Sequence, residues 1–165
     1  MRLMFALKIL VIPGSLRTGS HNVKLAAAAS HVLAEAGADV TRISLADFPL
    51  PIYDGDLQAK SGVPKNAVNL KRMIGVHHGV LLVTPEYNSS VPPLVKNTID
   101  WITRVQDAHE VRGQVFFEKP FAIAAASEKP ARWNPRAGGA AVDPFRLPRD
   151  GHSQSTRAVI RRSSL

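Results

Sequence analysis

The 165-residue chain contains no cysteine. This absence excludes disulfide bonds, thiol catalysis and metal sites built on thiolate ligands. Aromatic residues are scarce, and no apolar run approaches the roughly 20 residues that a membrane-spanning helix needs. The first residues show neither the apolar region nor the cleavage site of a signal peptide. We therefore expect a cytoplasmic protein without a membrane segment.

Charge is unevenly distributed along the chain. Residues 1–127 carry 13 Lys and Arg against 10 Asp and Glu, whereas residues 128–165 carry eight against three. A nucleic-acid role would have to rest on this basic end, which has few aromatic residues and no binding motif, so nucleic acid is not an expected partner. A metal site is not expected either, because the histidines lack ligand spacing and His77 and His78 would point to opposite faces of a strand.

Short apolar runs alternate with helical patterns along most of the chain. Buried strands are predicted at 9–12, 79–84 and 120–126, and an alternating strand is predicted at 39–44. Helices are predicted at 20–36, 64–73 and 94–105, and Gly37 is the predicted stop of the first. Prolines, aspartates and a glycine between 46 and 57 predict a loop: Pro49, Pro51, Asp54, Gly55 and Asp56. This alternation indicates an α/β protein whose parallel sheet is covered by helices on both faces.

Two polar loops follow the first and third predicted strands, at 14–22 and 85–90. Parallel sheets bind ligands at the carboxyl ends of their strands, where the strand order reverses. In a flavodoxin-like order of 2-1-3-4-5 that reversal lies between strands one and three. The sequence therefore predicts one site between these loops. The first loop also opens a helix, and the unpaired N–H groups of a helix N-terminus favour phosphate.

Three motifs occur in and after these loops: Gly14-Ser-Leu-Arg-x-x-Ser-x-Asn22, Thr84-Pro-Glu-Tyr-Asn-x-Ser-x-Pro92 and Lys96-Asn-x-Ile-Asp-Trp101. In this order and spacing they resemble the NADPH-dependent FMN reductase family, which includes bacterial chromate- and quinone-reducing flavoproteins. The resemblance covers residues 7–127. It implies a flavodoxin-like three-layer sandwich of strand order 2-1-3-4(-5), non-covalent FMN, NADPH or NADH as co-substrate, and a homodimer or homotetramer.

The resemblance also implies which residues bind the cofactor. In the first loop, the FMN phosphate would be held by Ser15, Arg17, Ser20 and Asn22, with Leu16 beside them. In the second loop, the isoalloxazine ring would be lined by Pro85, Glu86, Tyr87 and Asn88, with Ser90 in the same loop. Ser127 would begin a further loop beside the flavin.

The implied reaction carries electrons from a nicotinamide through FMN to quinones, flavins, azo compounds or metal oxyanions. No catalytic acid or base is expected, because the flavin supplies this chemistry. Asn97, Asp100 and Trp101 are interpreted as residues of helix packing or of an oligomer interface. A flavodoxin-like electron carrier, or a truncated remnant without flavin or catalysis, is the alternative function.

Two other enzyme classes lack their sequence signatures in this chain. The loop after the first strand is not the Gly-x-Ser-x-Gly elbow of a serine hydrolase. The Gly-x-Gly-x-x-Gly fingerprint of a dinucleotide-binding domain is also missing.

The family pattern stops after Ser127. Residues 128–165 are rich in Arg, Pro, Gly and Ser, so we predict a disordered basic tail after a flavodoxin-like domain at 1–127. The last strand and helix of the fold are accordingly expected to be missing or disordered. A shifted reading frame is one hypothesis for this tail. Codons for Trp133-Asn-Pro-Arg-Ala137 can be chosen so that reading one base later gives Gly-Ile-Arg-Ala. Relatives in the family typically carry these residues at this point. The nucleotide sequence of the gene tests the hypothesis.

Overall fold

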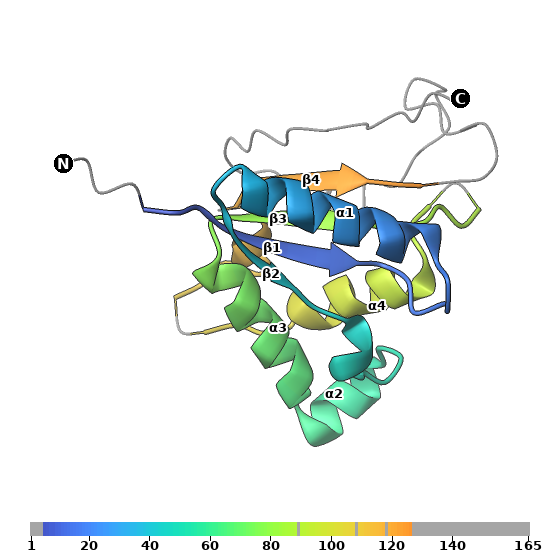
Figure 1. Ribbon diagram of the computed structural model, residues 1–165. Coiled ribbons are helices and arrows are strands. Elements are labelled where there is room, and N and C mark those ends of the chain that lie inside the picture. The colour runs from blue at the N-terminus through green and yellow to red at the C-terminus, as the bar shows by residue number, and fades with distance from the viewer. Residues whose placement is uncertain (1–4, 89, 108, 118, 127–165) are drawn as a thin grey trace, which may run out of the picture.

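One parallel sheet forms the centre of the molecule. The computed structural model describes residues 5–88, 90–107, 109–117 and 119–126. Its strands are β1 (Lys8–Pro13), β2 (Asp39–Arg42), β3 (Gly79–Val83) and β4 (Phe121–Ala124), arranged in the order β2-β1-β3-β4 (Figure 1). All neighbouring pairs are parallel. The predicted α/β class and strand order are confirmed, whereas the expectations for the fifth strand, the last helix and the tail fall outside the described residues.

Helix α1 (His21–Glu35) covers one face of this sheet (Figure 1). Its fully buried Ala26 belongs to the same apolar cluster as Val11, Val83 and Ala124, which come from three different strands. Small side chains on α1 allow the helix to lie close to the sheet. The helix stops where the sequence predicts, because Gly37 adopts a φ of 89°, a conformation that glycine accepts without steric cost.

The opposite face is covered by α3 (Lys65–Val76) and α4 (Pro93–Ile102), with the short α5 (Gln114–Phe117) beside them. Leu10 and Leu82 point to this side, whereas Val11 and Val83 point to α1, because successive strand residues alternate between faces. The helices on both faces complete the three-layer sandwich that the alternating pattern predicts.

The predicted loop at 46–57 is partly wrong. A 3-10 helix, η1 (Leu45–Asp47), and a two-turn helix, α2 (Gly55–Ser61), occupy the two ends of this region. The Asp54 side chain accepts hydrogen bonds from the backbone N–H groups of Asp56 and Leu57, and this cap stabilises α2 although the helix begins with glycine. The prediction counted Asp54 among the loop-forming residues of this segment and did not interpret it as a helix cap.

Side chains of the Lys96–Trp101 motif hold the segment between η1 and α2 against α4. The fully buried Trp101 donates its Nε1–H to the carbonyl oxygen of Pro51 at 2.7 Å, and Asn97 Nδ2 donates to the same oxygen at 2.9 Å. Asn97 Oδ1 accepts the backbone N–H of Tyr53 at 2.8 Å. Asp100 pairs with Lys96 within the helix. In this structure Asn97 and Trp101 therefore serve packing.

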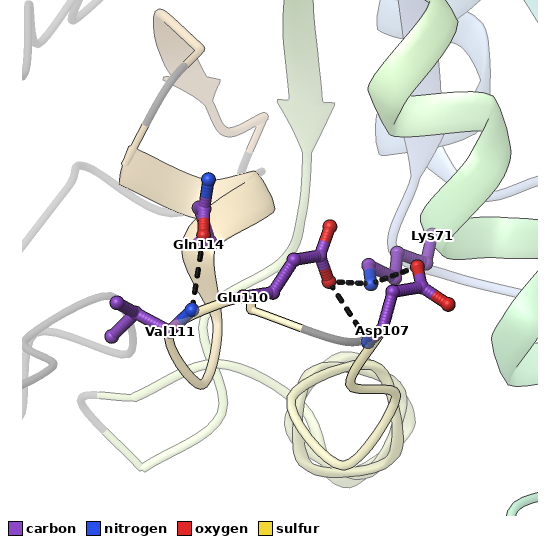
Figure 2. A network of polar contacts seen from close by, with 5 residues as sticks. All are labelled: Lys71, Asp107, Glu110, Val111 and Gln114. Carbon is purple, nitrogen blue, oxygen red and sulfur yellow. Dashed lines mark hydrogen bonds and ion pairs between the residues drawn. The ribbon is translucent and has the colours of Figure 1, made fainter.

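A second polar network ties the segment after α4 to α3 (Figure 2). The ammonium group of Lys71 donates to Asp107 Oδ2 at 2.9 Å and to the Glu110 carboxylate, and its side chain is only 10% exposed. Burial lowers the pKa of Lys71, but the hydrogen bonds to Glu110 and Asp107 outweigh it and leave that pKa raised. The hydrogen bond from Lys71 lowers the pKa of both Asp107 and Glu110.

This network predicts the acid sensitivity of the fold. Groups with a depressed folded-state pKa contribute stability that is present above their unfolded pKa, about 4, and lost as the pH falls through the lower folded value. Substituting Lys71→Met should therefore flatten the decline of the unfolding free energy below about pH 4. Urea denaturation between about pH 7 and pH 2 measures this, with the exposed Lys65→Met on the same helix as the control. Parallel curves for wild type and Lys71→Met would contradict the prediction.

Candidate cofactor site

The loops after β1 and β3 begin side by side at the carboxyl edge of the sheet. The two strands pair in parallel up to Pro13 and Val83, which are register partners. One residue further, the N–H of Gly14 donates to the carbonyl oxygen of Val83 at 2.8 Å. The structure thus brings the starts of the two predicted loops together at one edge.

Gly14 allows these loops to approach closely. A Cβ atom at this position would lie 2.6 Å from Thr84 Oγ1 and 2.7 Å from Val95 Cγ2, closer than real Cβ contacts. Thr84 and Val95 are 4% and 2% exposed, and both are β-branched, so neither side chain has room to turn away. Only glycine fits where the first loop passes the end of β3 and the start of α4.

The first loop closes as a tight turn before α1. The N–H of Ser20 donates to the carbonyl oxygen of Arg17 at 3.1 Å, and Gly19 takes the positive φ of 72° that the turn requires. The N–H of Arg17 donates to Ser15 Oγ at 3.3 Å. As a result Leu16 and Arg17 are exposed, Ser15 is half-buried and Ser20 is buried.

The N-terminus of α1 has no side-chain cap. Ser20 occupies the N-cap position, yet its side chain makes no capping hydrogen bond, and the first turn contains no acidic residue. The first intrahelical bond runs from the N–H of Lys24 to Ser20, so the N–H groups of the preceding turn lack intrahelical partners. These groups and the helix dipole favour a negatively charged ligand.

The second loop ends in a narrow hairpin. Tyr87 and Ser90 form an antiparallel bridge, with N–H···O distances of 2.8 and 3.0 Å. Asn88 has a φ of 52°, a left-handed conformation that asparagine tolerates better than most residues. Pro85 is half-buried, whereas the other predicted residues of this loop are exposed at the edge: Glu86, Tyr87, Asn88 and Ser90.

Asn22 brings a third segment to the same edge. Its Nδ2 donates to the carbonyl oxygen of Ala126 at 3.1 Å, and the N–H of Ala126 donates to Asn22 Oδ1 at 2.9 Å. Sequence reasoning missed this contact, because no local pattern signals a partner 104 residues away. Ser127, the next predicted site residue, lies outside the described residues.

The described residues contain no cluster of His, Asp and Glu side chains that could hold a metal ion. In the same part of the chain, every helix falls short of the length and apolar character needed to cross a bilayer.

Comparison with known proteins identifies the family. The family model for NADPH-dependent FMN reductase matches residues 7–133. The chain belongs to this family. The match extends six residues past the point where the motifs of the family stop being recognisable in the sequence, at Ser127.

Curated relatives carry reductase names. The chain is 42% identical over 102 residues to a quinone reductase of Escherichia coli (strain K12). The aligned region covers 61% of this chain and 53% of the relative. It is 38% identical over 125 residues to an NAD(P)H-dependent FMN reductase of Pseudomonas aeruginosa, covering 73% of this chain and 60% of the relative. The chain thus spans little more than half the length of these curated relatives.

Solved structures support the same fold. FerB, a flavoenzyme NAD(P)H:(acceptor) oxidoreductase from Paracoccus denitrificans, superposes with a TM-score of 0.56 at 33% identity, covering 74% of this chain and 62% of that one. An azoreductase from Bacillus anthracis str. Sterne superposes with a TM-score of 0.53 at 19% identity, covering 72% and 68%, and this likeness concerns the fold alone.

The close contact at Gly14 generates a prediction. Gly14→Ala should destabilise the protein by about 1–3 kcal/mol, because the new methyl group overpacks the buried Thr84 and Val95. Gly75→Ala is the matched control: its added methyl group meets open space in α3 and should stabilise the helix by about 0.5–1 kcal/mol. Chemical denaturation of both variants measures the difference. Equal stability of wild type and Gly14→Ala would refute the close approach of the loops.

Proposed function

We propose that this chain binds FMN and acts as an NAD(P)H-dependent reductase, passing electrons to quinones, flavins, azo compounds or metal oxyanions. The observation that carries the proposal is the N-terminus of α1, which has neither a side-chain cap nor an acidic first turn. It opens at the same edge as the loop after β3, in a chain of the FMN reductase family. A phosphate at this helix end would place a flavin beside that loop.

The first loop offers suitable partners for a phosphate. Ser15 and Ser20 contribute hydroxyl groups, and Arg17 is exposed on the turn between them. Among the described residues, no carboxylate forms an ion pair with Arg17. Its guanidinium group is therefore free to form charge-assisted hydrogen bonds with a phosphate, for which its planar fork is well suited.

The second loop offers a surface for the flavin ring. Tyr87 is 50% exposed at the bridge that closes the hairpin, and its chain neighbours Glu86 and Asn88 are exposed as well. These groups would contact an aromatic ring and its polar edge. FMN supplies the hydride and electron transfer when bound, so the residues of the chain have to bind and orient it and need not act as acid or base.

A homodimer or homotetramer is the proposed assembly. Leu16 and Tyr87 are each 50% exposed and lie on the two loops of the site. A second copy of the chain that covered these apolar side chains would also shield the flavin from water.

The phosphate assignment predicts the effect of removing Arg17. Arg17→Ala should weaken FMN binding by about 1.5–3 kcal/mol, because a charge-assisted hydrogen bond is lost. Arg72→Ala on α3 removes the same charge from an exposed position on another element and serves as the control. Fluorescence titration with FMN measures both affinities. An unchanged affinity of Arg17→Ala would rule out a phosphate contact by Arg17.

Turnover tests the proposed reaction. The 165-residue protein loaded with FMN should consume NADPH when a quinone such as menadione is added, and absorbance of the reduced nicotinamide measures the rate. Protein that binds FMN but leaves NADPH unconsumed would point to an electron carrier. Protein that binds no FMN would point to a flavin-free remnant, and either result would defeat the proposed function.

A further inference from the structure

We propose that the side chain of Asn22 is a positioning residue, which holds the segment after β4 beside the flavin and does not bind the FMN phosphate. This inference rests on the proposed FMN site and assigns Asn22 a role different from the one its motif implies. The motif suggests a phosphate ligand, whereas the geometry points to a bond between two parts of the protein.

The amide of Asn22 is already engaged on both of its ends. Nδ2 donates to the carbonyl oxygen of Ala126 at 3.1 Å while Oδ1 accepts the N–H of the same residue at 2.9 Å. These two bonds satisfy the peptide groups of Ala126 much as a neighbouring strand would. The residue is 4% exposed, so its side chain faces the protein interior.

The pair joins elements that the sheet leaves unconnected at this edge. Asn22 lies in the first turn of α1, which follows β1, whereas Ala126 lies two residues beyond β4. Strand β3 separates β1 from β4, and the bond from Thr84 N–H to Ala124 is the final one between the ends of β3 and β4. In Figure 1 the first turn of α1 and the end of β4 lie at the same end of the sheet.

In this arrangement the backbone and the Asn22 side chain of the first turn of α1 have different roles. The backbone N–H groups at the start of α1 point out of the helix end, where a phosphate would bind. The Asn22 side chain turns to the segment after β4 and fixes its distance from α1. Removing the side chain should therefore disturb the surroundings of the flavin and leave the phosphate contacts in place.

Riboflavin, which lacks the phosphate, distinguishes the two roles. The wild-type 165-residue chain, Asn22→Ala and Arg17→Ala are titrated with FMN and with riboflavin. Asn22→Ala should weaken the binding of both flavins by the same factor, on the order of tenfold. The reason is that the peptide groups of Ala126 lose their hydrogen bonds to Asn22, so the segment after β4 is no longer held. Arg17→Ala should weaken the binding of FMN and leave the binding of riboflavin unchanged. A loss confined to FMN in Asn22→Ala, or no loss for either flavin, would overturn the proposal.

Two further readouts follow the position of the segment. The visible absorption band of bound FMN should shift in Asn22→Ala at saturation and keep its wild-type shape in Arg17→Ala. Ala126→Pro removes the N–H that Asn22 accepts, without altering Asn22 itself, and should reproduce the pattern of Asn22→Ala. A proline variant that binds both flavins like wild type would count against the positioning role.

Hydrogen exchange of the wild type keeps the test independent of any variant's folding. The N–H of Ala126 should be protected in the flavin-free protein if Asn22 holds it, and exchange at the rate of an unstructured peptide would overturn the proposal. Failure of the proposed function is a different result: wild type would bind neither flavin, whatever the protection of Ala126.

Discussion

The parallel pairing of β1 with β3 is the constraint on which the rest of the structure depends. It carries both strands to the same edge in register, so that the chain leaves Pro13 and Val83 at neighbouring points. The bond from Gly14 N–H to Val83 then keeps the first loop against the second. The helix that follows β1 also starts at this edge, so the positive end of its dipole lies there. The candidate site is thus a consequence of strand order.

Beyond the sheet, the chain is held by side chains that replace missing backbone partners. Peptide groups in loops cannot use the sheet ladder, yet buried ones still need hydrogen bonds. Asn22 supplies both bonds for Ala126 after β4. Trp101 and Asn97 share the carbonyl oxygen of Pro51 after β2. A contact between side chains alone adds to these: Lys71 joins α3 to the segment after α4 through two carboxylates (Figure 2). Each contact links residues far apart in the sequence.

Local pattern was sufficient to predict most elements, because strands and helices bury their apolar residues with different periods. The segment 79–84 and the alanine-rich helix before Gly37 fall within a residue of their predicted bounds. The segment 46–57 was the failure, since proline, glycine and aspartate all favour loops and Asp54 was counted among the loop residues although it caps α2. The site was predictable as a pair of polar loops, but the partner of the Asn22 side chain was not, because it depends on the path of the chain after β4.

The sequence by itself determined the class of fold and the two loops that carry polar groups, since these follow from apolar periodicity and from the residues after each strand. The strand order came from the family resemblance that the motifs carry. Only the tertiary structure decided which atoms meet. It placed Thr84 and Val95 around the missing Cβ of Gly14, left the start of α1 without a side-chain cap, and engaged Asn22 with Ala126. The physical reason is that such contacts depend on ångström-scale distances between segments far apart in the chain, and no local pattern records them.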